Sequence, residues 1–369
     1  SGGIDSSLLT ALLQKNSTRP LKTFTVGFED QLYDEAPHAK AIAQHLGTDH
    51  TTLYCTDQDL RQLLPQLAYF CDEPFGDTSL FPTHLVAALA RQEVTVALSA
   101  DGADELFGGY TRYEVAYRWF PKMKVWPLAL RKHLATLLAW VPPHWLERNK
   151  NYFPVLRNYQ QLPHKIHKLQ QALRAENQLE FFKAATAYNH RATLQPFLPH
   201  FQPRFANQST KALPNRLLGL LGLLDITTYL EGDILAKVDR ASMQVALEAR
   251  DPFLDHHLVE FALALPDEFK IRNGSTKYLL RQILYQYVPR ELLERPKQGF
   301  SLPMRKWLRT HFQDELKQMS TDSAFAETFQ LYPQAIQQLV CRFLKPKTFV
   351  DHHLVWFLFV LFQWQKRWL

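Results

Sequence analysis

The chain has 369 residues, 46% of them hydrophobic, which is enough to bury a large core and to form two or three domains. Its formal net charge of +6 is modest and its basic residues are spread along the chain, so nothing points to a nucleic-acid-binding protein. The longest apolar run, residues 354–362, is too short to span a bilayer and predicts a buried helix. Cys55, Cys71 and Cys341 have no metal-ligand spacing and cannot all pair, which is typical of proteins of the reducing cytoplasm.

The sequence begins with the motif SGGIDSS at residues 1–7, which leads directly into an apolar run with helical spacing. Glycines ahead of a helix leave backbone N–H groups converging at its N-terminus, where the helix dipole also favours negative charge. The motif therefore predicts a phosphate cradle, although it lacks the lysine of the G-x-x-x-x-G-K-[ST] loop. Asp5 would repel phosphate unless a divalent cation lay between them, so we expect Mg²⁺-phosphate there. For the motif taken alone, an ordinary Gly-Ser turn that caps a helix is the alternative.

Residues 1–112 alternate between helical and strand patterns. This alternation predicts an α/β fold in which a parallel sheet is flanked by helices and ligands bind at the carboxyl ends of the strands. The predicted strands cover residues 21–28, 50–54 and 94–98, and the predicted helices cover residues 6–15, 34–46, 60–70 and 83–91. A phosphate-binding loop normally follows the strand that delivers it, whereas this sequence starts inside the motif. We therefore expect a truncated N-terminus that lacks this first strand.

Helical patterns dominate after residue 112. Residues 113–215 mix aromatic, leucine and basic residues with several prolines, which predicts a helical insertion with irregular connections. Residues 216–369 predict a large helical C-terminal portion that completes the active site. Within it we expect helices over residues 217–239, 242–249, 257–265 and 277–287, followed by a loop at residues 295–301.

An acidic motif, SADGADELFGGY at residues 99–110, directly follows the third predicted strand. Asp101, Asp104 and Glu105 lie within five residues, and acids this close repel one another unless a cation neutralises them. Asp104 together with Asp5 would then form an oxygen-rich Mg²⁺ site from two neighbouring strand ends. The alternative is N-capping of the next helix by one acid, which does not account for three.

Two further segments carry candidate cations. Lys237 and Arg240 are three residues apart, so they can share one face of a predicted helix. Lys297 lies in the predicted loop, between a proline and a glycine. The alternatives are structural salt bridges for the first segment and a solvent-exposed lysine for the second.

Together these segments resemble the synthetase domain of glutamine-hydrolysing asparagine synthetase, within the N-type ATP pyrophosphatase superfamily. The SGGIDSS motif is similar to the pyrophosphate loop (PP-loop) of that superfamily. Residues 99–110, 237–255 and 295–300 follow in the order of the asparagine synthetase family. The resemblance covers nearly the whole chain and is weakest over residues 120–210. It implies the adenine nucleotide α-hydrolase-like, PP-loop fold.

The resemblance also implies the composition of the site. The pyrophosphate part of ATP would contact Ser1, Gly2, Gly3, Asp5, Ser6 and Ser7, and the rest of the nucleotide Val26, Ser99, Ala100 and Gly102. Mg²⁺ would bind Asp5 and Asp104, while Asp101, Lys237 and Lys297 would act in catalysis. The sequence departs from the usual residues of the family at Ala100, where Gly is common, and at Asp101, where the better-known members have Glu.

The implied reaction is the ATP-dependent amidation of L-aspartate to L-asparagine. Attack of the β-carboxylate on the α-phosphorus gives β-aspartyl-AMP and pyrophosphate, with the charge of the leaving group neutralised by Mg²⁺ and lysines. Ammonia then displaces AMP, and Asp101 would accept the proton. In the family the ammonia comes from glutamine through an N-terminal glutaminase domain, which we expect to be missing here together with its cysteine nucleophile.

Two other functions stay open. A related enzyme could adenylate another carboxylate, as β-lactam synthetases do, because no aspartate-binding set stands out beyond candidates at residues 71–74 and 77–79. An inactive interaction scaffold is the second alternative, against which the retained acids and lysines argue. For an enzyme we expect cytoplasmic location and small-molecule partners, with no nucleic acid and no membrane. The oligomeric state, a homodimer included, is open.

Overall fold

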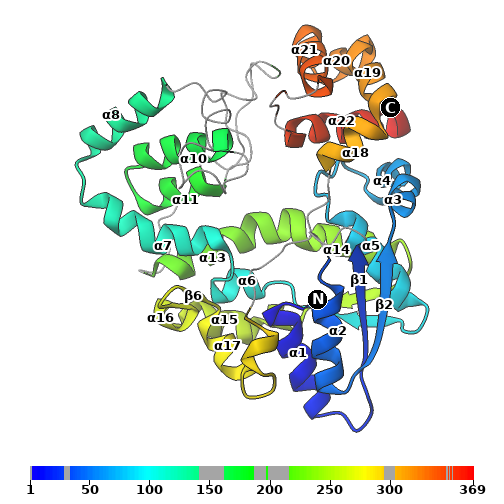
Figure 1. Cartoon of the computed structure of the whole chain (residues 1–369), viewed down its shortest axis with the longest axis vertical. Helices are drawn as coiled ribbons and strands as arrows, with labels where there is room; N and C mark the ends of the chain where they lie inside the picture. The colour runs from blue at the N-terminus through cyan, green and yellow to red at the C-terminus, as the bar shows by residue number, and fades with distance from the viewer. Residues whose placement is uncertain are drawn as a thin grey trace.

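The structure, a computed structural model, describes residues 2–28, 34–140, 162–186, 197, 216–294, 304–345, 348, 350 and 352–369. Within these residues the chain is mostly helical and contains three two-stranded sheets (Figure 1). Two of the sheets are parallel: β1 (Lys22–Phe28) with β2 (Asp49–Cys55), and β3 (Val96–Leu98) with β4 (Glu248–Arg250). The third is an antiparallel hairpin of β5 (Ile271–Arg272) and β6 (Ser275–Thr276). No helix among the described residues is long and apolar enough to cross a membrane.

The α/β alternation predicted for the N-terminal part is present. Helix α1 (Ile4–Lys15) begins two residues earlier than predicted, whereas α2 (Ala36–Leu46) and α5 (Leu80–Arg91) lie close to the expected ranges. Both α2 and α5 pack against β1. Helix α2 stops where expected because Gly47 adopts the left-handed conformation at its C-terminus, with φ of +70°.

Two of the predicted helices differ in the structure. The helix expected over residues 60–70 is divided into α3 (Asp57–Leu63), a 3₁₀ turn (Leu64–Gln66) and α4 (Leu67–Phe70). Pro65 lies in this turn, and its missing N–H and its ring interrupt a regular helix.

The helix expected over residues 242–249 is wrong. Helix α14 (Ala236–Met243) ends there in a Schellman motif, with the N–H of Leu247 donating to the carbonyl of Ser242 and the N–H of Ala246 to that of Met243. Ala246 holds the left-handed position of this motif, with φ of +54°. Because alanine rather than glycine occupies it, nothing in the sequence marks the end of the helix, and residues 248–250 form β4 instead.

Strand β4 connects the C-terminal portion to the N-terminal α/β part. It pairs with β3 in parallel register, with Leu98 opposite Arg250, so a segment of the C-terminal portion belongs beside the N-terminal α/β part. Strands β4, β5 and β6 all fall in the part of the chain where only helices were predicted.

A nearly continuous helical rod covers residues 217–243. It consists of α13 (Leu217–Asp225), a π-helical segment (Ile226–Leu235) and α14. The hydroxyls of Thr227 and Thr228 donate to the carbonyls of Leu223 and Leu224, one turn back. Such bonds compete with the backbone ladder and loosen a helix, which is consistent with the wider π-helical winding that follows.

The remaining helices form most of the core. Their bounds are α6 (Ala103–Phe107), α7 (Thr111–Lys124), α8 (Leu128–Ala139), α10 (Leu162–Arg174), α11 (Gln178–Thr186), α15 (His256–Ala264), α16 (Asp267–Lys270), α17 (Tyr278–Leu284), α18 (Met304–Thr310), α19 (Gln313–Thr321), α20 (Ser323–Thr328), α21 (Pro333–Leu344) and α22 (His352–Trp368). Helix α22 contains the apolar run at residues 354–362 and packs it into the largest hydrophobic cluster, as predicted. A second cluster joins α1, α6, α15 and α17, and a third joins α7, α10, α11 and α13.

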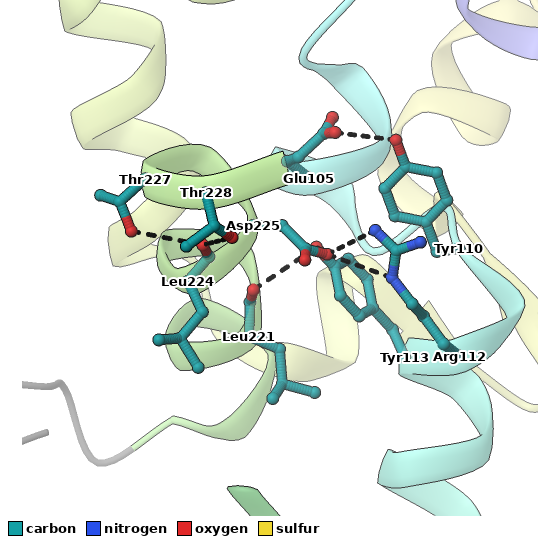
Figure 2. Close-up of polar contacts among 9 residues, drawn as sticks. All are labelled: Glu105, Tyr110, Arg112, Tyr113, Leu221, Leu224, Asp225, Thr227 and Thr228. Atoms are coloured by element: carbon teal, nitrogen blue, oxygen red, sulfur yellow. Dashed lines mark hydrogen bonds and ion pairs between the residues drawn. The ribbon is translucent and has the colours of Figure 1, made fainter. Parts of the chain in front are cut away.

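A buried ion pair connects α7 to the rod (Figure 2). Arg112 lies 2.7 Å from Asp225, and the hydroxyl of Tyr113 donates to the same carboxylate oxygen at 2.5 Å. The guanidinium also stacks 3.8 Å from the ring centroid of Tyr110, whose hydroxyl donates to the fully buried Glu105 of α6. This network therefore holds the start of α7 and the acidic helix α6 against the rod.

We expect Asp225→Asn to lower the free energy of unfolding by about 3–5 kcal/mol, because it leaves the buried Arg112 cation without its charge partner. Urea unfolding followed by circular dichroism measures this. Glu114→Gln is the matched control, since it breaks the more exposed pair with Arg118 on the same helix and should cost at most about 1 kcal/mol. Equal losses in the two variants would contradict the assignment.

Candidate functional site

The N-terminus of α1 is the first component of the site. Gly3 precedes the helix in an extended conformation, and Asp5 lies in the first turn. The side chain of Ser7 is buried, and its Oγ has no hydrogen-bond partner among the described residues. An unsatisfied buried hydroxyl is costly, and an anion at the positive end of this helix would relieve it. These features fit a phosphate oxygen at this position.

Two carboxylates converge on one ammonium group beside this helix end. Lys277 Nζ forms an ion pair with Asp5 and lies 2.7 Å from Asp104 Oδ1. Only 6% of the Lys277 side chain is exposed. Burial alone would lower the pKa of Lys277, but the two carboxylates outweigh it and raise this pKa above its ordinary value. The structure thus brings Asp5 and Asp104 together around a single positive charge.

The same geometry tests whether the site suits Mg²⁺. The carboxylates of Asp5 and Asp104 both reach the ammonium group of Lys277, so they can contact one shared cation. Carboxylate oxygens are also the ligands that Mg²⁺ prefers. Within the described part of the chain no group of three or more His, Cys, Asp or Glu residues could hold a metal. The two acids therefore fit a metal that takes its other ligands from phosphate oxygens and water.

Lys277 was missed by the sequence reasoning, which placed it inside a helix and assigned no role to it. The β5–β6 hairpin turns through Asn273 and Gly274, both with positive φ, and Lys277 itself has a φ of +53° just before α17. A non-glycine residue in this region is strained, and such strain is frequent at functional sites. The Asn-Gly pair was the available signal, since it predicts a tight hairpin, and the second strand of this hairpin ends directly before the lysine.

Of the nucleotide residues expected at strand ends, Ser99 and Ala100 directly follow β3, whereas Val26 lies inside β1, which continues to Phe28. Val26 is buried in β1 opposite Leu53. Ser99 and Ala100 follow β3, and Gly102 adopts a φ of +88° just before α6, where a Cβ would collide with Leu254. The carboxyl ends of β3 and β4 therefore form one edge of the site.

Asp101 has an acidic neighbour that the sequence did not single out. The hydroxyl of Ser99 donates to Asp101 Oδ2 at 2.5 Å. Asp251, the first residue after β4, is close enough for the two carboxylates to interact. Burial raises the pKa of Asp251 to about 6, and the charge of Asp101 adds to this effect.

Lys237 lies in a second lysine-carboxylate cluster. Its Nζ is 3.0 Å from Asp77 Oδ2 and 2.8 Å from Ser79 Oγ. Burial raises the pKa of Asp77, but Lys237 and the hydrogen bonds from Ser79 outweigh it and lower this pKa overall. Burial, followed by the charge of Asp77, raises the pKa of Asp233 in the π-helical segment to about 6. The structure thus joins Lys237 to the candidate segment at residues 77–79.

Some predicted site residues lie outside the described residues. They are Ser1, Lys297 and the rest of the loop at residues 295–301. The other candidate segment, residues 71–74, contacts the rod through Asp72, which pairs with Arg240 at 3.0 Å.

Comparisons with known proteins agree on one family. A family model described as Asparagine synthase matches residues 1–366. Asparagine synthetase [glutamine-hydrolyzing] 1 of Bacillus subtilis is 32% identical over 329 residues, which cover 88% of this chain and 49% of that protein. A putative asparagine synthetase [glutamine-hydrolyzing] of Mycobacterium tuberculosis is 35% identical over 317 residues, or 84% of this chain and 45% of that protein. The chain spans about half the length of the curated relatives it matches.

We expect Lys277→Met to make the fold dependent on Mg²⁺, because it removes the buried cation between Asp5 and Asp104 and leaves two carboxylates facing each other. Without metal its free energy of unfolding should fall by about 3–5 kcal/mol. Added Mg²⁺ should then raise its melting temperature more than that of the unmodified chain.

Thermal unfolding with EDTA or MgCl₂, without nucleotide, measures this response. Lys132→Met, which breaks an exposed pair with Glu176, serves as the control and should show no gain. An Mg²⁺ response of Lys277→Met no larger than that of the control would show that the two acids do not form a cation site.

Proposed function

This chain belongs to the asparagine synthase family, and from that premise we propose that it catalyses the ATP-dependent amidation of L-aspartate to L-asparagine through β-aspartyl-AMP. The observation that carries the proposal is the convergence of Asp5, Asp104 and Lys277 beside the N-terminus of α1. A metal-bound pyrophosphate suits this place, because it offers the backbone N–H groups of a helix end, an unsatisfied serine hydroxyl, and two carboxylates paired with a lysine.

The fold supports binding of the nucleotide across strand ends. Helix α5 packs against β1, and its Ala87 and Ala90 form a small hydrophobic cluster that also includes Phe24 of β1 and Ala97 of β3. One helix thus covers both parallel pairs. We propose that the two pairs belong to a single nucleotide-binding layer of the PP-loop type.

In the first step the residues around α1 receive the leaving pyrophosphate. The helix N-terminus and Ser7 hold its oxygens, and Lys277 contributes a positive charge. Mg²⁺ bound between Asp5 and Asp104 would supply further neutralisation of the charge that develops there. Lys297 is proposed from the family resemblance to act on the same charge. Val26, Ser99 and Ala100 orient the adenosine part.

In the second step Asp101 receives a proton. Ammonia attacks the acyl carbon of the adenylate, the bond to AMP breaks, and the excess proton on nitrogen must be taken up. Asp101 follows β3 at the edge of the site and has Ser99 as a fixed donor, which holds its carboxylate in place.

The cluster of Asp77, Ser79, Asp233 and Lys237 is the proposed contact for the amino-acid end of the substrate. It combines two carboxylates with one ammonium, and so it can bind a group that carries both an α-ammonium and an α-carboxylate. This composition favours an amino acid over a simple carboxylic acid, but it does not by itself select aspartate.

We propose that nitrogen reaches this part of the protein as ammonia, and that in a full-length protein it derives from glutamine. Cys55, Cys71 and Cys341 form no disulfide with one another, which supports a cytoplasmic location. Cys55 and Cys71 are buried, and burial raises the pKa of the Cys71 thiol to about 11. A thiolate is the nucleophile in glutamine hydrolysis, so Cys71 is poorly suited to this role.

We expect ATP, Mg²⁺, aspartate and ammonium to give asparagine, AMP and pyrophosphate in equal amounts. Product analysis by chromatography, with pyrophosphate release followed over a panel of carboxylic acids, measures both the reaction and the acceptor. ADP and phosphate as products would contradict adenylation. Release with another acid but not with aspartate would identify a related adenylating enzyme instead.

With glutamine as the sole nitrogen source, we expect no asparagine from this chain. The physical reason is that Cys71 stays protonated at neutral pH and Cys55 is buried. The same assay supplied with ammonium is the positive control. Glutamine-dependent synthesis that disappears in Cys71→Ser or Cys341→Ser would show that one of these thiols is reactive.

A further inference from the structure

Two acids follow adjacent parallel strands at the edge of the proposed site. The register places Leu98 of β3 opposite Arg250 of β4, and the N–H of Ser99 extends the ladder by donating to the carbonyl of Arg250 at 2.9 Å. Asp101 lies two residues beyond Ser99, and Asp251 follows Arg250 directly. The pairing of the strands therefore brings the two acids to the same edge, where the charge of Asp101 acts on Asp251.

One hydroxyl lies in contact with both carboxyl groups. Ser99 donates to Asp101 Oδ2 at 2.5 Å, and the Ser99 hydroxyl and the backbone N–H of Asp101 also lie close enough to Asp251 to favour its charged form. A serine hydroxyl has a single proton to donate. Asp101 and Asp251 can therefore both be satisfied by Ser99 only when one of them carries a proton of its own.

The second oxygen of Asp251 is also informative. Asp251 Oδ1 is buried and has no hydrogen-bond partner among the described residues. A buried carboxylate oxygen in this state is costly, and a proton on the pair reduces the cost.

No described cation offsets these two acids. Arg250 turns away and pairs with Glu248 at 2.7 Å, and Asp255 caps α15 by accepting from the N–H of His257 and Leu258. Among the described residues around Asp251, the charged group that shifts its pKa is Asp101. Burial and this like charge raise the pKa of Asp251 to about 6.

We propose that Asp251 is a positioning residue for Asp101, holding its carboxylate through Ser99 and sharing one proton with it as the amide forms. This inference rests on the proposed function. As the C–N bond forms, AMP leaves with the electron pair of the C–O bond, and the proton released from nitrogen passes to the carboxylate pair. Two like charges at close range repel each other, and one proton taken up by the pair relieves this repulsion.

The test separates the two half-reactions. Aspartate-dependent exchange of pyrophosphate into ATP reports adenylation, and asparagine formation at fixed total ammonium reports the amide step. Because ammonia itself titrates, each variant is compared with the unmodified chain as a ratio of rates at every pH. Asp251→Asn removes the charge at nearly constant shape, Asp251→Glu retains it, and Glu248→Gln on the same strand is the control.

For Asp251→Asn we expect exchange to stay within about twofold, while the amide step falls about tenfold at neutral pH because the pair that takes up the proton has lost one of its two charges. Toward acidic pH the ratio of amide rates should rise, since Asp251 of the unmodified chain, with its pKa raised to about 6, then takes up a proton and loses the charge that the variant lacks. Asp251→Glu should restore much of the amide rate, and Glu248→Gln should match the unmodified chain. In an Asp101→Asn background, Asp251→Asn should add little, because the two residues act as one unit.

Several outcomes would overturn the inference. Normal exchange together with an unchanged amide ratio at all pH values would show that Asp251 has no part in the step. Equal losses in both half-reactions with a lowered melting temperature would show a structural role only. Absence of aspartate-dependent exchange in the unmodified chain would contradict the proposed function itself, and this inference with it.

Discussion

The ion pairs between Lys277 and two carboxylates are the constraint on which the candidate site depends. Lys277 is 272 residues away from Asp5 in the sequence, yet the two side chains meet in the interior. Bringing three charges out of water is unfavourable unless they compensate one another. Helices α1, α6 and α17 must therefore be positioned so that these three side chains meet. The hydrophobic cluster that these helices share holds them in this position.

The surrounding structure reinforces α6 from the opposite side. Glu105 follows Asp104 directly and accepts from Tyr110, which in turn stacks on Arg112 of the buried ion pair with Asp225. The acidic helix is thus fixed between the Lys277 cluster and the helical rod. The rod continues through its π-helical segment to Lys237, so it also carries one of the candidate substrate contacts. A shift of this rod would therefore act on two parts of the site at once.

The sequence predicted the features that depend on neighbouring residues better than those that depend on residues far apart in the chain. The β-α alternation depends on local periodicity, and β1, α2 and α5 were found close to their expected ranges. The approach of Asp5 and Asp104 followed from the rule that parallel strands end at one edge of a sheet. Lys277 and Asp251 could not be found in this way, because their roles depend on a hairpin turn and on the pairing of β4 with β3. Strand β4 itself was hidden by Ala246, which occupies a left-handed helix end that glycine usually marks.

The distribution of charge gives a physical reason for treating the three acid pairs differently. Asp5 with Asp104, and Asp77 with Asp233, each have a lysine between or beside them, and for Asp77 the charge of Lys237 and the bonds from Ser79 outweigh burial and lower the pKa. Such pairs suit binding of cations or of charged groups, since their charge is already fixed. Asp101 and Asp251 have no such lysine among the described residues, and the hydroxyl of Ser99 is their shared polar contact instead. A pair with uncompensated like charge gains most from one proton, and this is the property that a proton acceptor needs at the moment the amide forms.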